Sequence, residues 1–268
     1  MIRAFYAFLI RDFYQTLSYR FAFLLDIASV FFNAATFFFV AKLFDSTSIE
    51  HLASYGGHYF PFVLIGIAFS TFQTAGLNSF SQNLRQEQFM GTLESVLVTP
   101  VTTPVYLAGS SLWDFLYATG EVIFYFVVAI CLFGLKLTQA NYFAAFVSVI
   151  LTLTTFMGLG ILAAAFILRF KRGNPVTWVI VTASELLGGV YFPTQILPDW
   201  MKTISNCIPM SHALQALRQS LLANGGFADI GDHLIYLLIF SLFIWPAGIF
   251  AFKLALKRSQ MDGSLGYY

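Results

Sequence analysis

Charged side chains are scarce in this sequence. Only 10% of its 268 residues are Asp, Glu, Lys or Arg, whereas about 25% is usual in a soluble domain. Hydrophobic residues make up 58% of the chain and 32 residues are Phe. A soluble fold of this length would need far more charge to cover its surface. The composition therefore predicts a membrane protein.

The sequence lacks the motifs of nucleotide hydrolysis, of several hydrolytic enzymes and of metal sites. The sequence has no Gly-rich loop ending in Gly-Lys-Ser/Thr, no His-Glu-x-x-His and no Gly-x-Ser-x-Gly, so we expect no catalytic residues in this chain. Its four His have no organised acidic or Ser partner in the sequence, and two cysteines, Cys131 and Cys207, are too few for a metal cluster or a disulfide framework. We therefore expect no metal site. Whether the two cysteines pair is left open.

The net charge also limits the choice of partners. The formal charge of +1 gives no concentrated basic face for phosphate groups, which excludes nucleic acid as the expected partner.

Six apolar runs can each cross a bilayer, because about 20 mostly apolar residues are needed for one helical crossing. The sequence thus predicts an all-α polytopic protein with residues 1–268 in a single transmembrane domain. The predicted spans are residues 21–44, 59–80, 104–135, 142–168, 175–192 and 234–256.

The distribution of Lys and Arg predicts the orientation of these spans. With six crossings both termini lie on one side, and that side receives ten of the 14 Lys and Arg. The positive-inside rule then places both termini in the cytoplasm, with the protein in the plasma (inner) membrane. The other side receives Lys42, Lys136, Lys202 and Arg218.

The first twenty residues have an amphipathic pattern. Arg3, Arg11 and Gln15 recur at multiples of four, whereas apolar residues from Ile2 to Phe13 occupy another face. This pattern predicts an interfacial helix over residues 1–20 that turns sharply near Arg20. A polar cap that only orients the first span remains an alternative.

Residues 81–100 form a polar connection that ends in a short amphipathic helix. Leu93, Val96 and Leu97 share one face of this helix, and Pro100 and Pro104 end it. An exposed apolar face of this kind must dock on something. The sequence leaves open whether it docks on another protein or on this chain's own bundle.

Residues 193–222 are apolar in part but do not resemble a seventh span. Pro198 and Pro209 interrupt a continuous helix, and charged residues such as Lys202 and Arg218 are costly at the bilayer centre. We expect a re-entrant or interfacial pair of short helices. Irregular backbone at membrane depth must be covered by protein or line a water-filled cavity, so this segment is predicted beside a pathway.

Glu185 lies near the middle of the fifth predicted span, just before Gly188 and Gly189. Carboxylates inside the membrane are costly and are usually functional, and a charge beside a helix break often lines a transport pathway. The alternative is a carboxylate that hydrogen-bonds a neighbouring helix while the two glycines allow close packing.

Three other carboxylates lie in the predicted spans. Asp114 and Glu121 are seven residues apart and so share a face of the third span, with Glu121 at shallow depth. Asp26, near the cytoplasmic end of the first span, is expected to pair with Arg20 or Arg3.

Taken together, the chain resembles the membrane subunit of an ATP-binding-cassette exporter of the type-2 permease family. The run from Glu87 to Glu94, followed by Pro100, is similar to the family's coupling segment. Gly-x-x-Phe-Pro at residues 189–193, then Leu-Pro-x-Trp at 197–200, Pro209 and Arg218, is similar to its outer hairpin, and this second motif is the more specific.

This resemblance implies a dimer of the chain, or of the chain with a close relative, in membrane lipid and with two copies of a separate ATPase subunit. ATP and Mg²⁺ would bind to the ATPase, so that no cofactor is expected on this chain. The residues implied in ATPase coupling are Glu87, Gly91, Thr92, Leu93, Glu94 and Leu97. The residues assigned to the substrate pathway or gate are Glu121, Glu185, Gly189, Tyr191, Phe192 and Pro193.

The function implied is outward, ATP-driven transport of an amphipathic or lipophilic substrate such as a drug, a lipid or a lipid-linked glycan. Two other functions stay open at this point. One is a polytopic membrane enzyme that uses Asp114, Glu121 and Glu185 as acid/base groups, and the other is a proton-coupled carrier with Glu185 or Glu121 as its proton site.

Overall fold

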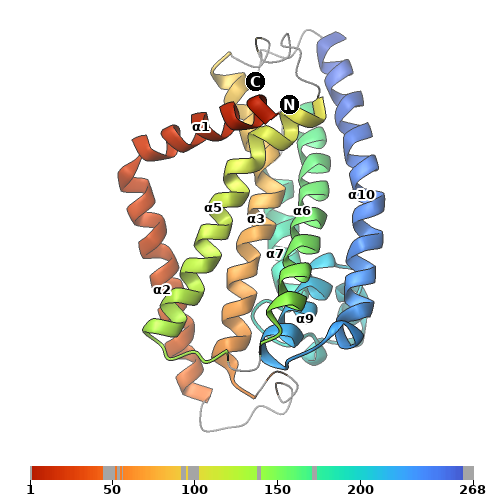
Figure 1. Cartoon of the computed structure of the whole chain (residues 1–268). Helices are drawn as coiled ribbons and strands as arrows, with labels where there is room; N and C mark the ends of the chain where they lie inside the picture. Colours follow the sequence, from red (N-terminus) through yellow and green to blue (C-terminus); the bar gives the residue numbers. More distant parts are fainter. Residues whose placement is uncertain are drawn as a thin grey trace.

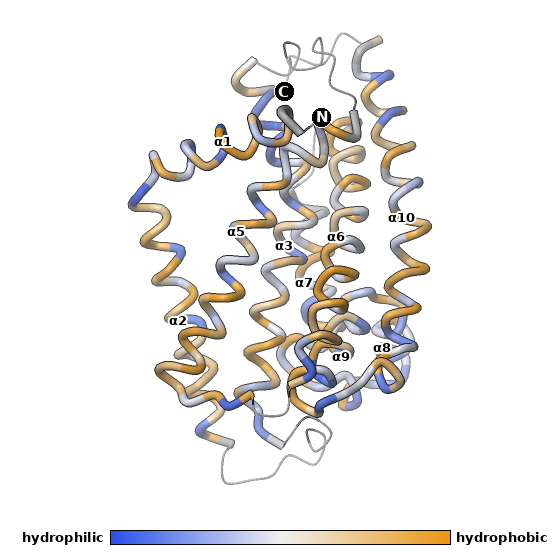
Figure 2. The backbone as a smooth tube through the Cα atoms, viewed as in Figure 1, coloured by the Kyte–Doolittle hydropathy of each residue, from blue (hydrophilic) through white to orange (hydrophobic). Residues whose placement is uncertain are grey.

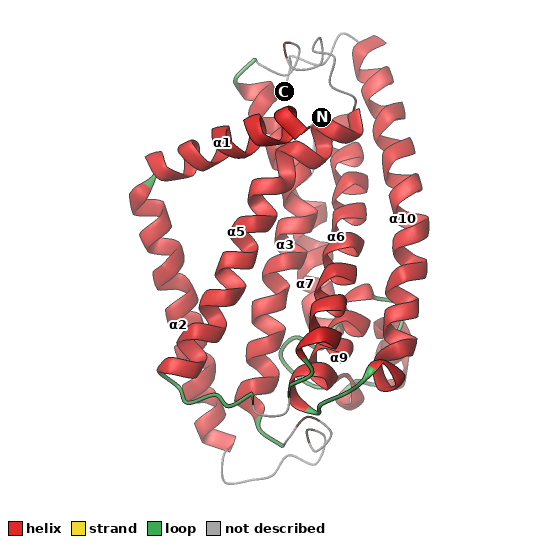
Figure 3. Ribbon diagram, viewed as in Figure 1, coloured by secondary structure: helices red, strands yellow, loops and turns green. Residues whose placement is uncertain are grey.

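A computed structural model of the chain describes residues 2–44, 52, 55, 57–91, 95, 103–137, 140–170 and 174–261. The regular structure of these residues is helical, and no strand occurs among them (Figure 3). The long helices run side by side in one bundle, with α1 lying across one end (Figure 1). In chain order the helices are α1 (Ile2–Ser18), α2 (Arg20–Phe44), α3 (Tyr59–Phe89), α5 (Thr103–Cys131), α6 (Tyr142–Phe170), α7 (Asn174–Leu187), the 3₁₀ turn η2 (Thr194–Ile196), α8 (Asp199–Ser205), α9 (Pro209–Leu222) and α10 (Phe227–Met261).

The first two helices meet at the sharp turn that the sequence predicts near Arg20. α1 ends at Ser18, Tyr19 forms the turn, and α2 begins at Arg20. α1 is held against α5, since the Trp113 indole donates a 2.7 Å hydrogen bond to Thr16 Oγ1.

Five of the described helices are long and apolar enough to cross a membrane: α2, α3, α5, α6 and α10. Hydrophobic residues predominate along α6 in Figure 2. In α7, which falls in the fifth predicted span, the apolar helix runs only from Thr177 to Leu187. At 1.5 Å per residue even the whole 14-residue helix covers about 21 Å, against about 30 Å for a hydrocarbon core.

Several helices have ends that differ from the predicted spans. α3 continues to Phe89, because no Gly or Pro interrupts residues 81–89, and the chain leaves the helix just before Gly91. α5 ends at Cys131, although Leu135 is still buried in the core. α10 begins at Phe227 and includes polar turns that a search for apolar runs omits.

Small residues allow α6 to pack closely on both of its main neighbours, α3 and α10. A Cβ atom added at Gly160 would collide with the carbonyl oxygen of Gly76 in α3, and one added at Gly248 would press on the carbonyl oxygen of Gly158. Thr155 and Ser241 also join α6 to α10 by a 2.8 Å hydrogen bond between their hydroxyls. Small residues and hydroxyls are the usual means of helix association in membranes.

We therefore expect Gly160→Ala to destabilise the bundle by about 1–3 kcal/mol, the usual cost of overpacking a close contact. The measurement is the thermal unfolding midpoint of the detergent-purified protein. Gly120→Ala is the matched control: Gly120 is an exposed helical glycine with nothing within 4 Å of an added Cβ, and Ala favours the helix by about 1 kcal/mol. Equal midpoints for both variants would contradict the close contact.

Candidate functional site

Arg218 lies buried at the end of the bundle that contains η2, α8 and α9. It extends from α9, and only 3% of its surface is exposed. Its guanidinium donates from Nε to the Phe62 carbonyl (3.1 Å), from Nη1 to the Gly189 carbonyl (2.7 Å) and from Nη2 to the Val190 carbonyl (3.0 Å). It also stacks 3.4 Å from the centre of the Phe62 ring. The charge is therefore solvated by backbone dipoles of α3 and of the turn after α7.

Two glycines allow this turn to approach α3. A Cβ atom on Gly66 would collide with the Val190 carbonyl oxygen and lie 2.8 Å from Arg218 Nη2. Gly189 has a φ of +78°, which side chains with a Cβ rarely adopt. Gly189 is thus needed for the turn after α7, and Gly66 of α3 is needed for the close contact.

The same turn positions Tyr191 beside Glu185. The Tyr191 hydroxyl donates to Glu185 Oε2 at 3.3 Å, and the Tyr191 carbonyl accepts a 2.9 Å hydrogen bond from the Tyr59 hydroxyl. The Tyr191 ring stacks on Phe37 of α2 with ring centres 5.8 Å apart. Glu185 is therefore held by a side chain that α2 and α3 position.

A cavity of about 580 Å³ lies between these groups and the middle of the bundle. Its wall comes mainly from α3 and α5, and it includes three of the residues assigned to the pathway, Glu121, Glu185 and Tyr191. Here the structure brings together two carboxylates that are 64 positions apart in the sequence. Gly189, Phe192 and Pro193 are not among the described residues of the cavity wall; they form the turn behind it.

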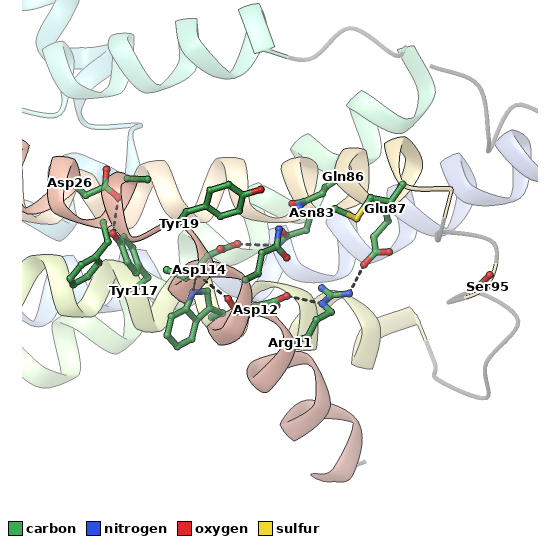
Figure 4. Close-up of a pocket in the computed structure, with 16 residues that line it drawn as sticks. Arg11, Asp12, Tyr19, Asp26, Asn83, Gln86, Glu87, Ser95, Asp114 and Tyr117 are labelled. Atoms are coloured by element: carbon green, nitrogen blue, oxygen red, sulfur yellow. Dashed lines mark hydrogen bonds and ion pairs between the residues drawn. The ribbon is translucent and has the colours of Figure 1, made fainter.

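A second cavity, of about 710 Å³, opens at the α1 end of the bundle (Figure 4). It lies between the α1–α2 turn, the end of α3 and the start of α5. The two cavities adjoin, because both are lined by the same four residues of α3 and α5, which are Asn83, Gln86, Asp114 and Tyr117. The two cavities together thus form a passage, lined by both apolar and polar side chains, from the α1 end towards the turn after α7.

Hydrogen bonds inside the second cavity join its three walls. Asn83 Nδ2 donates to Asp114 Oδ2 at 2.9 Å, and the Tyr117 hydroxyl donates to Asp26 Oδ2 at 2.7 Å. Asp26 therefore pairs with a tyrosine of α5. The sequence alone instead predicts Arg20 or Arg3 as its partner.

The described part of the predicted coupling segment is tied to α1. Arg11 Nη1 donates to Glu87 Oε1 at 2.5 Å, and Arg11 Nε donates to Asp12 Oδ1 at 2.7 Å. Burial, together with the nearby charge of Glu87, raises the pKa of Asp12 above its usual value, although the contact with Arg11 lowers it. Gly91, with a φ of +67°, ends the described stretch; the predicted coupling residues Thr92, Leu93, Glu94 and Leu97 lie outside the described residues.

The sequence matches the model of one protein family, described as "ABC-2 type transporter", over residues 3–222. The chain belongs to the ABC-2 type transporter family. It is therefore an ABC-2 permease subunit, a multi-pass membrane protein in the transporter class rather than an enzyme in itself. The matched region runs from α1 to the end of α9 and so includes both cavities and Arg218.

Individual relatives agree with this family. The chain is 24% identical over 197 residues to the inner membrane transport permease YadH of Escherichia coli K12, which covers 71% of this chain and 75% of the relative. It is 28% identical to the linearmycin resistance permease protein LnrN of Bacillus subtilis, over 50% of this chain and 37% of the relative. It is 22% identical to the probable multidrug ABC transporter permease YbhR of Escherichia coli K12, over 59% of this chain and 43% of the relative.

Two histidines of this permease lie in contact, although no local pattern in the sequence predicts a partner for either. His212 of α9 and His233 of α10 place their Nδ1 atoms 3.0 Å apart, and Tyr236 stacks on His212 at 3.8 Å between ring centres. Their spacing of 21 residues bridges two helices, so no local pattern could have indicated the contact. The two cysteines of the permease, Cys131 and Cys207, are both free.

The permease should depend on Arg218 for stability. Arg218→Met removes three hydrogen bonds from buried carbonyls, and an unsatisfied buried polar group costs about 1–3 kcal/mol. We expect a fall of about 10 °C in the thermal unfolding midpoint in detergent. Arg218→Lys should lose most of this stability as well, because a single ammonium cannot copy the planar guanidinium fork.

Lys202→Met serves as the control for this prediction. The Lys202 side chain is 41% exposed, and its ammonium pairs with Asp199 at 3.2 Å, a surface contact worth at most about 1 kcal/mol. A midpoint for Arg218→Met equal to that of Lys202→Met would show that the three carbonyls do not need the guanidinium.

Proposed function

We propose that this permease moves an amphipathic or lipophilic substrate outward across the inner membrane, driven by ATP that a separate ATPase subunit hydrolyses. The observation that carries the proposal is the match to the ABC-2 type transporter family over residues 3–222. The chain has no phosphate-binding loop of its own, which fits a permease whose ATPase is another polypeptide.

The proposed topology has six spans, with α7 as the short fifth span. Its missing length is supplied by η2, α8 and α9, which would enter the membrane from the outer side and return as a re-entrant hairpin. Two features support this arrangement: α1 and the C-terminal end of α10 lie at the same end of the bundle (Figure 1), and that end also receives most of the basic residues. Both termini would then be cytoplasmic, and the name of YadH supports the inner membrane.

The proposed coupling starts at the end of α3, where the ATPase would contact Glu87, Glu94 and the residues between them. Leu93 and Leu97 would fill a groove on the ATPase. The ion pair of Glu87 with Arg11 would pass movement of this segment to α1, and the α1–α2 turn would pass it to the first span. ATP can drive such a change only if it binds the two arrangements with different affinity.

The proposed transporter contains two permease subunits, either two copies of this chain or this chain with a close relative, and two ATPase subunits. The low burial of α2 supports a second permease: only 11% of the most apolar stretch of this helix is buried within the chain. The side chains of α2 that this chain leaves exposed can contact a second permease subunit or lipid.

The passage formed by the two cavities and the names of the relatives both support the proposed substrate class. The passage contains polar groups but lies inside an apolar bundle. A substrate with an apolar body and a polar group would therefore find a matching surface for each part. The relatives named for linearmycin resistance and for multidrug transport support a drug-like or lipid-like molecule.

The coupling proposal predicts that Leu93→Asp together with Leu97→Asp prevents the ATPase from binding, because two charges would replace the apolar face that docks. The measurement is whether the ATPase copurifies with the tagged permease from mild detergent, with one ATPase expected for each permease. Met261→Asp is the control: this residue is 78% exposed at the same end of the bundle but lies outside the coupling segment, and it should keep the ATPase bound.

Two outcomes would contradict different parts of the proposal. If the double variant retains the ATPase, the coupling contacts are wrong. If the unaltered permease never copurifies with an ATPase and stays monodisperse alone, the ATP-driven mechanism itself is wrong.

A further inference from the structure

We infer that the two adjoining cavities form a single site for an amphipathic organic cation. This inference rests on the proposed function, since it names the chemical class of the molecule that the permease moves. The argument uses the charge of the walls, the partners of the carboxylates, the aromatic side chains and the size of the cavities.

The described walls of the two cavities carry mostly negative charge. The six carboxylates that line them are Asp12, Asp26, Glu87, Asp114, Glu121 and Glu185. Arg11 is the one Lys or Arg among the described lining residues, and both Asp12 and Glu87 already contact it. The remaining four carboxylates face the passage without a basic residue in its described walls.

These four carboxylates have neutral partners or none. Asp26, Asp114 and Glu185 accept hydrogen bonds from Tyr117, Asn83 and Tyr191 respectively. Glu121 forms no hydrogen bond or ion pair with the described residues. Neutral donors leave the negative charge uncompensated, and charges taken out of water are costly unless a counter-charge or a proton neutralises them. A bound cation would supply the counter-charge.

One buried hydroxyl of the wall lies beside a carboxylate. Ser79 is 5% exposed and lines the cavity that contains Glu121 and Glu185. Its Oγ lies beside the Asp114 carboxylate but forms no well-shaped hydrogen bond with the described residues. Buried polar groups in native proteins are normally paired, and the Asp114 carboxylate is an acceptor for this hydroxyl, so Ser79 adds a neutral donor and no positive charge to the wall.

The other wall residues fit the apolar body of such a cation. Six aromatic side chains of the described residues line the cavities together with the carboxylates: Tyr19, Phe23, Trp113, Tyr117, Tyr125 and Tyr191. Aromatic faces attract organic cations, most strongly where water is excluded. Each cavity alone, of about 710 and 580 Å³, has the size of a small-molecule site, about 300–1,000 Å³, so the two together can hold a molecule with a large apolar body. The negative charge and the aromatic surface of the cavity walls are together suited to a cation with a large apolar body.

The test compares two probes of the same shape and opposite charge, tetraphenylphosphonium and tetraphenylborate. Equilibrium binding of each is measured to the full-length chain in nanodiscs of phosphatidylcholine, which has no net charge. Binding to empty nanodiscs is subtracted, because the dipole potential of the bilayer favours uptake of tetraphenylborate by the lipid itself. We expect tetraphenylphosphonium to bind more tightly than tetraphenylborate. Glu121→Gln with Glu185→Gln should raise the Kd for tetraphenylphosphonium by about tenfold or more, as loss of a contact to a charged group predicts.

Asp199→Asn is the matched control variant. It removes a carboxylate that is fully exposed on α8 and should leave the Kd for tetraphenylphosphonium unchanged. If the double variant does not fold, Glu121→Gln alone replaces it, because this carboxylate has no partner among the described residues that the change would leave unpaired.

An unchanged Kd in the folded double variant, or equally tight binding of tetraphenylborate, would overturn the cation site. An unchanged Kd would mean that protons neutralise the carboxylates. Because binding is measured without ATPase, that result leaves the proposed function intact. Failure of the unaltered chain to copurify with an ATPase would contradict the proposed function whatever the binding result.

Discussion

The fork of hydrogen bonds from Arg218 is the contact on which the end of the bundle that contains η2, α8 and α9 depends. One guanidinium joins α9, the beginning of α3 and the turn after α7. That turn carries Tyr191, which contacts Glu185. Arg218 therefore helps to position the wall of the cavity that Glu121, Glu185 and Tyr191 line. The positive charge needs no acidic partner here, because several carbonyl dipoles converge on it and the Phe62 ring covers it.

The bundle is closely packed between α6 and α10 but encloses a cavity between α3 and α5. Between α6 and α10, hydroxyls bond to carbonyls of their own helix or to one another, as Thr155 and Ser241 do, and glycines bring the backbones close. Between α3 and α5, by contrast, Asn83, Asp114 and Tyr117 face a cavity instead of being fully enclosed. The first arrangement suits a rigid support, and the second leaves polar groups for a ligand.

The sequence predicts those parts of the fold that follow from local pattern. Apolar runs indicate the long helices, and Arg20 marks the turn between α1 and α2. Helix ends are less predictable, because α3 and α10 continue as polar helix beyond their apolar runs. Glu121 and Glu185 can each be recognised as costly charges, but their shared cavity depends on how α3, α5 and α7 pack. The contacts of Asp26 with Tyr117 and of His212 with His233 also join helices that are distant in sequence, and local pattern does not record such pairs.

The contacts of Arg218 also have a direction along the chain. All three acceptor carbonyls, on Phe62, Gly189 and Val190, come earlier in the sequence than the donor. A polypeptide made from its N-terminus therefore presents the complete set of acceptors before the arginine leaves the ribosome. All the acceptors of this buried charge are therefore already synthesised when Arg218 appears, and α9 can pack on α3 and on the turn after α7 as it emerges.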